Sequence, residues 1–324
     1  MNLEQSLQKI SEVINKNNYF ILFTHSYPDG DALGSLIAFF KMLENLKKKV
    51  YMVCNSQMPY QYAFLPYSSL IKKDLSFIDP DTGYTAVFLD CSDKDRIKFN
   101  NAFNNKNIIC TINIDHHISN TYFADINAVD GTKSAASEIV YILFEKYFNK
   151  YMDSEIAVAL YTGILTDTGK FQYSNTTRDV HKIISSLIDY DINPSQIYSN
   201  IYECEPFNKF KLLEIAFKRT KIFNDDKLIY SYLLEKDFRK LNLPFSANDG
   251  IIELLRTANK VKVAALFKEV SRNCFKVSLR ASEENVNVSE IAQKLGGGGH
   301  KMAAAYTFSG SLKKAVDMLK KSIF

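Results

Sequence analysis

Eight acidic and histidine side chains are the groups of this sequence best suited to chemistry. They are His25, Asp29, Asp31, Asp90, Asp115, His116, His117 and Asp167. If they meet in one crevice, the carboxylates repel one another and take up protons unless cations hold them, so such a cluster indicates a metal site. Two divalent ions in one site can generate hydroxide for in-line attack at phosphorus.

Each of these groups taken singly also has a purely structural interpretation. Asp29 and Asp31, in HSYPDGDALGS, fit a turn followed by the N-cap of a helix. Adjacent histidines such as His116 and His117 are common on surfaces and in hydrogen-bonded cores, and many strands end in an aspartate like Asp90. The metal hypothesis therefore depends on whether the fold brings the residues together.

Four buried strands are the elements that must position these groups. Continuous apolar runs bounded by turn signals predict strands at 19–24, 49–54, 85–90 and 108–114. Apolar residues at helical spacing predict helices between the first two strands, at about 134–148 and at about 154–166. This alternation predicts an α/β fold with a mostly parallel sheet flanked by helices. Because ligands bind at the carboxyl ends of parallel strands, we expect the eight side chains to meet at one edge.

The length of 324 residues favours two domains. We expect a metal-binding catalytic domain at 1–190, a helical connector at 191–220 and a substrate-binding domain at 221–324. The last of these has a separate α+β pattern. Its elements are predicted as strands at 228–234, 261–269, 274–280 and 303–308, helices at 248–259 and 287–295, and a final helix.

The composition is that of an ordinary soluble protein. Apolar residues make up 46% of the chain, charged residues 23%, and the net charge is +4, so phosphate binding must come from local clusters. No segment approaches the ~20 consecutive apolar residues of a membrane span. The five widely spaced cysteines suit reduced thiols rather than a disulfide framework. We expect a cytoplasmic protein with no membrane partner.

The ligand types narrow the choice of ion. Carboxylates dominate, imidazole is a minority and cysteine is absent from the set, which favours Mn²⁺ or Mg²⁺ over structural zinc, with Mn²⁺ preferred because histidine participates. The candidates are too many for one ion. Two ions about 3.5 to 4 Å apart, bridged by a carboxylate, would use them all.

The same motifs resemble those of the DHH phosphoesterase family. HSYPDGDALGS, the strand end at Asp90, NIDHH and GILTDTGKF are similar to its four successive motifs, and VSLRAS with NVSEIAQKLGGGGHKMAAA is similar to the C-terminal domain associated with it. The resemblance spans nearly the whole chain in the right order, and GGGGH is its most specific element.

The resemblance implies two Mn²⁺ ions per chain, with Mg²⁺ as a possible substitute. Their ligands would be His25 and Asp29 for one ion, Asp31, His116 and Asp167 for the other, and Asp90 as the bridge. Two further residues would assist the chemistry. Asp115 would orient a ligand from outside the coordination sphere, and His117 would contact the scissile phosphate or assist the leaving group.

The glycine run of the C-terminal region suggests a phosphate pocket. Backbone N–H groups of Gly297, Gly298 and Gly299 can form an anion-binding concavity, and Arg280 and His300 can add charge-assisted hydrogen bonds. The alternative interpretation of the run is a flexible turn. The family pattern often has a further glycine after the small residues, and this chain departs from it with Ala305 there.

Within the family, a chain of this length with GGGGH resembles the stand-alone enzymes that act on small nucleotides. We expect a cytoplasmic Mn²⁺-dependent phosphodiesterase that cuts cyclic di-AMP or short linear dinucleotides such as pApA into 5′-mononucleotides. The alternatives are a phosphatase of 3′-phosphoadenosine 5′-phosphate (pAp) and a non-catalytic nucleotide sensor. Long duplex nucleic acid is not an expected partner, because it would need a continuous basic groove. Family members often pair, so a homodimer is expected by analogy.

Overall fold

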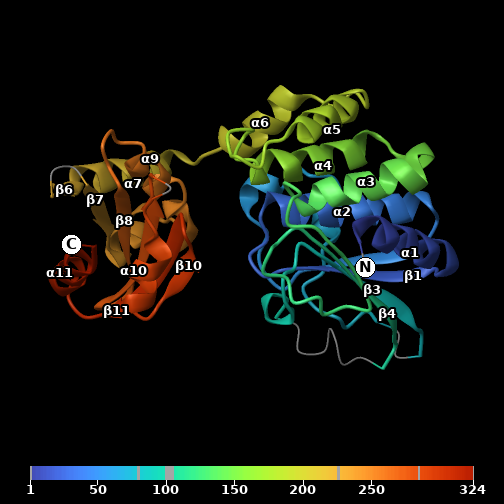
Figure 1. Cartoon of the computed structure of the whole chain (residues 1–324), viewed down its shortest axis with the longest axis horizontal. Coiled ribbons are helices and arrows are strands. Elements are labelled where there is room, and N and C mark those ends of the chain that lie inside the picture. The colour runs from blue at the N-terminus through green and yellow to red at the C-terminus, as the bar shows by residue number, and fades with distance from the viewer. Residues whose placement is uncertain (1, 79–80, 99–105, 225–226, 284, 324) are drawn as a thin grey trace. The chain divides into compact units, whose positions relative to one another are not determined.

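Two β-sheets organise the chain, one in each of two units that span Met1–Cys204 and Glu205–Phe324 (Figure 1). The computed structural model describes residues 2–78, 81–98, 106–224, 227–283 and 285–323. Each unit has its own hydrophobic core.

The sheet of the first unit is wholly parallel. Its strand order is β2-β1-β3-β4-β5, with bounds β1 Tyr19–Thr24, β2 Lys49–Val53, β3 Tyr84–Leu89, β4 Ile108–Asp115 and β5 Ile126–Val129. Every residue of β1 and β3 is buried, as expected for the central strands of a parallel sheet. The four strands predicted from apolar runs are present. The short edge strand β5 was not predicted, because INAV is too brief to stand out as an apolar run.

All helices of the first unit contribute to one core on one face of this sheet. They are α1 Leu3–Lys16, α2 Gly30–Asn45, α3 Ala136–Phe148, α4 Ser154–Asp167, α5 Arg178–Ile188 and α6 Pro194–Tyr202. Side chains of β1 alternate, so Phe20 and Leu22 face this core while Phe23 joins a second apolar cluster on the opposite face. The predicted α/β class is confirmed, with the helices gathered on one side.

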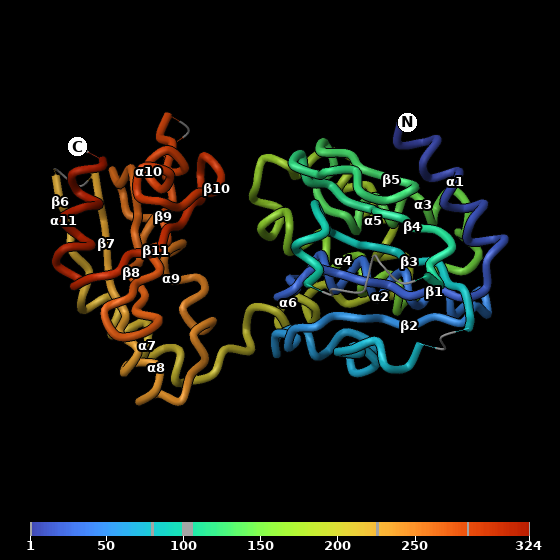
Figure 2. Tube along the Cα trace, turned by 90° about the horizontal axis from the view of Figure 1, so that it is seen from below, coloured from blue at the N-terminus to red at the C-terminus, as the bar shows by residue number. Residues whose placement is uncertain are grey.

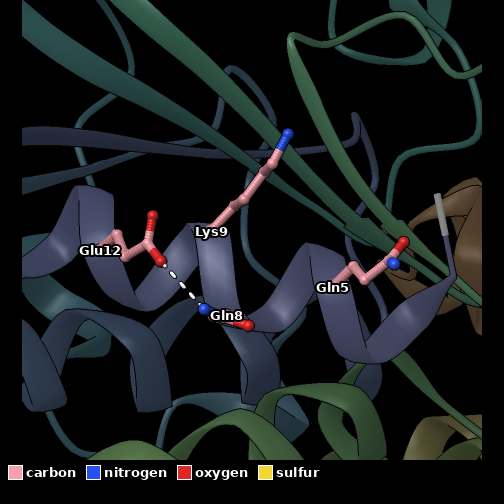
Figure 3. Close-up of a pocket in the computed structure, with 4 residues that line it drawn as sticks. All are labelled: Gln5, Gln8, Lys9 and Glu12. Atoms are coloured by element: carbon pink, nitrogen blue, oxygen red, sulfur yellow. Dashed lines mark hydrogen bonds between the residues drawn. The ribbon is translucent and has the colours of Figure 1, made fainter.

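The first helix was not predicted, because its charged outer face interrupts the apolar pattern. Ile10 and Ile14 are buried, while Gln5, Gln8, Lys9 and Glu12 line a shallow depression along its outer side (Figure 3). There Gln8 Nε2 donates to Glu12 Oε1 at 3.2 Å (Figure 3). None of the eight candidate residues lines this depression.

Helices α2 and α4 pack closely because glycines lie between them. A Cβ on Gly34 would stand 2.4 Å from the carbonyl oxygen of Ala159, and one on Gly163 would stand 2.8 Å from Asp31 Oδ1. Contacts this short exclude any side chain at both positions. The glycines of HSYPDGDALGS and GILTD therefore allow the two helices that carry Asp31 and Asp167 to approach each other.

The second unit contains a mixed sheet with helices on both faces. The strand order is β10-β11-β9-β8-β7-β6, with β7 and β8 parallel and the other pairs antiparallel. The strands are β6 Lys221–Phe223, β7 Leu228–Leu233, β8 Val263–Ser271, β9 Cys274–Ala281, β10 Gly298–His300 and β11 Ala303–Ser309. Helices α10 Val288–Lys294 and α11 Leu312–Ile323 share one core, and α7 Phe207–Lys218, α8 Glu235–Leu241 and α9 Ile251–Arg256 share the other.

The segment 191–220, expected to be a connector, is divided between the units. Ile197 and Ile201 of α6 are buried in the core of the first unit, whereas Leu212 and Ala216 of α7 are buried in the second. Apolar side chains on each helix thus bind it to a different core. In the described parts of the chain, no helix is both long enough and apolar enough to cross a membrane.

Candidate metal centre

His116 lies among three carboxylates at the carboxyl edge of the parallel sheet. Its Nε2 is 3.2 Å from Asp167 Oδ2, 3.6 Å from Asp90 Oδ1 and 3.9 Å from Asp31 Oδ2. These residues follow β3 and β4 or lie at the ends of α2 and α4. The structure therefore brings together groups that are more than 130 residues apart in sequence, from Asp31 to Asp167.

Asp90 and His25 are buried with polar atoms that no protein group satisfies. They are 2% and 4% exposed, and Asp90 Oδ1 and His25 Nε2 have no hydrogen-bond partner among the described residues. Asp90 also has a left-handed backbone, with φ of 56°, a conformation that costs a non-glycine residue about 1 kcal/mol or more. Unsatisfied buried atoms on a strained residue are expected where a cation completes the contacts.

Asp29 caps a helix and also lies beside two other candidate ligands. Its Oδ1 accepts hydrogen bonds from the backbone N–H groups of Asp31 and Ala32 at 3.1 and 3.0 Å, so it is the N-cap of α2. A ligand atom from each of Asp29, His25 and Asp90 also lies within 4.8 Å of the others. The capping interaction fixes the carboxylate beside the other two residues.

Asp31 is held by the N-terminus of a different helix. Its two carboxylate oxygens accept hydrogen bonds from the backbone N–H groups of Ala136 and Ser137, at 2.6 and 2.9 Å, in the first turn of α3. The side chain is 0% exposed, and burial raises the pKa of its carboxyl group while the charge of His116 opposes the rise. Asp31 therefore joins α2 to α3 as well as facing the cluster.

We expect Asp31→Ala to lower stability as well as turnover. The substitution leaves two buried N–H groups without an acceptor, which costs about 2 kcal/mol of unfolding free energy. His116→Ala removes no such hydrogen bond and should cost less. Denaturant unfolding of both variants in excess Mn²⁺, with turnover measured in parallel, distinguishes the two effects. An Asp31→Ala protein as stable as the wild type would contradict this role.

Asp115 orients His117 rather than facing the cluster directly. Its Oδ1 lies 2.7 Å from His117 Nδ1, and its Oδ2 accepts from Asn120 Nδ2 at 2.6 Å. Burial alone would raise the pKa of Asp115, but the hydrogen bond from His117 and the charges of the histidines lower it overall. An ionised Asp115 keeps the proton on Nδ1 and leaves His117 Nε2 free to accept one.

Arg96 is a member of the site that sequence analysis missed. Its Nη1 lies 3.4 Å from His117 Nε2. Asp93 accepts from the Arg96 backbone N–H at 3.0 Å, which ends the loop after β3 in a short 3₁₀ turn, Lys94–Arg96. The sequence DCSDKDR offers only a basic residue six positions after Asp90, a signal too weak to identify it beforehand.

The carboxylates repel one another strongly in the absence of a cation. Burial raises the pKa of Asp90 well above its ordinary value, and the charges of Asp31 and Asp29 raise it further. Burial, followed by the same two charges, raises the pKa of Asp167 to about 9. Positive ions within the cluster would reverse this repulsion and return the carboxyl groups to their ionised form.

Three overlapping groups in the described chain have the composition of a divalent-cation site. They are His25 with Asp29 and Asp90, Asp31 with His116 and Asp167, and Asp90 with His116 and His117. In each group the ligand atoms lie within 4.8 Å of one another, and oxygen and imidazole nitrogen are the only donors. These donors and the unsatisfied atoms of His25 and Asp90 fit Mn²⁺ or Mg²⁺.

The residues predicted to bind substrate lie together in the second unit. Gly298, Gly299 and His300 form the edge strand β10, which pairs with β11 so that Gly298 faces Ala305 and His300 faces Ala303. Ala303 also pairs with Arg280 of β9. Two glycines of the run, Gly298 and Gly299, therefore belong to a strand, and Gly296 and Gly297 precede it.

Close packing explains two of these glycines. A Cβ on Gly297 would stand 2.2 Å from the carbonyl oxygen of Ala305, and one on Gly299 would stand 2.6 Å from the Cα of Ala304. Gly298 has open space around it, and His300 is exposed. Arg280 is already paired with Glu253, at 3.0 Å, so a phosphate at this site would compete with that carboxylate.

Family models match both units of the chain. The DHH family N-terminal domain matches residues 19–164, and the DHHA1 domain matches residues 225–323. Together the two matches cover most of the sequence in the order typical of the family. The chain belongs to the DHH family.

Two relatives of this DHH chain are named as bifunctional oligoribonucleases and PAP phosphatases. A Thermus thermophilus protein named bifunctional oligoribonuclease and PAP phosphatase NrnA is 29% identical over 94% of this chain and 89% of its own length. The Bacillus subtilis protein of the same name is 23% identical, with 91% of each chain covered. The expectation of a hydrolase of this class is confirmed at the level of the family.

Solved structures share the DHH fold. An exopolyphosphatase-related protein from Bacteroides fragilis superposes with a TM-score of 0.91 at 23% identity, covering 99% of this chain and 96% of that one. RecJ from Thermus thermophilus, in complex with Mn²⁺, superposes with a TM-score of 0.51 at 12% identity, and the superposition covers 99% of this chain and 54% of the RecJ chain. At these identities the likeness concerns the fold alone.

Proposed function

We propose that the protein is a Mn²⁺-dependent phosphodiesterase that cleaves short linear dinucleotides or cyclic di-AMP into 5′-mononucleotides. The observation that carries the proposal is the cluster of buried carboxylates and imidazoles in which Asp90 Oδ1 and His25 Nε2 have no hydrogen-bond partner among the described residues. The names of its relatives support a small nucleotide substrate, and linear dinucleotides fit those names better than the cyclic compound.

The metal ligands we propose correspond to the groups of side chains whose ligand atoms lie within 4.8 Å of one another. We propose His25 and Asp29 for one ion, Asp31, His116 and Asp167 for the other, and Asp90 shared between them. Mg²⁺ could replace Mn²⁺ with the same donors. When bound, the ions supply positive charge that stabilises the pentacovalent transition state and acidifies water for the attack at phosphorus.

His117 and Arg96 act on the phosphate from the side of β4 and the loop after β3. Because Asp115 holds the proton on His117 Nδ1, a proton taken up at Nε2 makes an imidazolium that can pass it to the leaving oxygen. The guanidinium of Arg96, 3.4 Å from that nitrogen, can donate to a non-bridging phosphate oxygen. Both groups therefore stabilise charge that develops during cleavage.

The second unit is proposed to bind the end of the substrate. Arg280, His300 and the backbone of Gly297, Gly298 and Gly299 are grouped around β10 and β11. A terminal phosphate would draw Arg280 away from Glu253. The homodimer and the cytoplasmic location remain predictions, which mass measurement and cell fractionation test.

A substrate panel tests the proposed function. Purified protein is incubated with pApA, cyclic di-AMP or pAp in Mn²⁺ and in Mg²⁺, and the products are separated by chromatography. Release of AMP from pApA in Mn²⁺ is the expected result. Preferential phosphate release from pAp would favour the phosphatase that the names of the relatives include, and tight nucleotide binding without turnover would indicate a sensor instead.

A further inference from the structure

Tyr27 has a conformation and an exposure that the fold itself does not require. It lies between His25 and Asp29 in the loop after β1, its φ is 59°, and its side chain is 78% exposed. A bulky residue in the left-handed region costs about 1 kcal/mol or more, which asparagine or glycine would largely avoid. The ring buries too little surface to offset that cost.

Neighbouring loops fix this strained backbone in place. The Tyr27 N–H donates to Ser56 Oγ at 2.9 Å, and the Ser26 N–H donates to the carbonyl oxygen of Arg96 at 2.9 Å. Asn55 accepts from Ser26 Oγ at 2.8 Å and donates to the carbonyl oxygen of Lys98 at 3.0 Å. The loops after β1, β2 and β3 therefore hold the backbone of Tyr27 at the edge where the candidate ligands gather.

One cation lies near this ring without a carboxylate partner among the described residues. Lys98 Nζ is 5.7 Å from the centroid of the Tyr27 ring. Arg96, whose backbone accepts from the Ser26 N–H, contacts His117 Nε2 through Nη1. An exposed aromatic ring beside a lysine is the kind of surface that binds bases and phosphates of single-stranded nucleic acid. A protein partner would instead need a contiguous apolar patch around the ring.

We propose that Tyr27 stacks on a nucleobase next to the scissile phosphate and that Lys98 contacts an adjacent phosphate oxygen. This inference rests on the proposed function, because it assumes that the cluster acts on a nucleotide. It makes Tyr27 a substrate-binding residue rather than a catalytic one. The strain of its backbone is then the cost of presenting the ring to the substrate.

The test compares Tyr27→Asn with Tyr27→Phe on pApA and on two analogues in which one or the other adenine is replaced by hydrogen. We expect Tyr27→Asn to raise KM for pApA about tenfold with little change in kcat, since stacking on one base is lost. Tyr27→Phe keeps the ring and should stay within about twofold of the wild type. On one of the two analogues, wild type and Tyr27→Asn should become equal.

Two further measurements keep the outcomes distinct. Calorimetric titration of the Mn²⁺-loaded proteins with a non-cleavable methylenephosphonate diadenylate gives Kd without turnover, and thermal unfolding shows whether Tyr27→Asn is at least as stable as the wild type. Ile109→Asn removes another exposed apolar side chain, at the beginning of β4, and should change neither KM nor Kd.

Unchanged KM and Kd in Tyr27→Asn would overturn the inference, and so would a penalty that persists on both analogues or a lowered Tm. A loss in Tyr27→Phe equal to that in Tyr27→Asn would also overturn it, because the hydroxyl group would then be the contact. If the wild-type protein cleaves no nucleotide, the proposed function is refuted but the role of Tyr27 is not. The Kd values of wild type and Tyr27→Asn for the non-cleavable diadenylate still decide that role.

Discussion

Asp90→Asn is expected to reduce turnover of a dinucleotide by about 1,000-fold or more while the protein stays folded. Asp90 is the carboxylate that faces His25, His116 and His117, at 3.4, 3.6 and 3.5 Å. Asparagine keeps the shape of the side chain but removes the negative charge that two cations would share. Losing several kcal/mol of transition-state stabilisation corresponds to a decrease of this size.

The same substitution should make the metal-free protein more stable. Burial and the neighbouring carboxylates raise the pKa of Asp90, so a neutral amide at this position removes a source of repulsion. Stabilisation by added Mn²⁺ should shrink in the variant. Steady-state turnover and calorimetric unfolding, each with and without Mn²⁺, measure both effects.

Asp95→Asn is the matched control, because Asp95 is an exposed aspartate in the 3₁₀ turn five residues further on. It should leave turnover and the response to Mn²⁺ unchanged. An Asp90→Asn variant with wild-type turnover would refute the metal centre. A variant that unfolds would point to a structural role for the carboxylate.

Removing divalent cations should abolish hydrolysis. It should also make the folded protein less stable as the pH rises. The pKa of Asp167 rises from 3.8 to about 9 in the folded, metal-free protein, and the pKa values of Asp31 and Asp90 also rise. Between about pH 4 and pH 9 these carboxyl groups bind more protons in the folded state than in the unfolded state. Their contribution to the free energy of unfolding is therefore largest below about pH 4, and it is lost as the pH rises towards 9.

Saturating Mn²⁺ should remove most of this pH dependence, because the ions displace the protons. Thermal unfolding of chelator-treated protein from pH 5 to pH 9, with and without Mn²⁺, follows the change. Calorimetry in buffers of different ionisation enthalpy counts the protons released on binding. Metal-free protein whose Tm rises across this range, or binding that releases no protons, would show that the carboxyl groups are not held as described.

Strand identity and the choice of chemistry could be predicted from the sequence. Runs such as YFILF and AVFL are apolar throughout because central parallel strands are buried on both faces, so local composition reveals them. The rule that parallel strands end at one edge then places Asp90 and Asp115 together. The side chains that follow these strands indicate a divalent metal from the sequence alone.

Only the tertiary structure decided how the groups are held. Asp31 accepts its hydrogen bonds from Ala136 and Ser137, more than 100 residues away, and Arg96 reaches His117 through a loop with no marked pattern. The close approach of α2 to α4 depends on glycines whose partners lie on another helix. Sequence periodicity records which face of an element is buried, whereas contacts between distant elements depend on packing that no local pattern encodes.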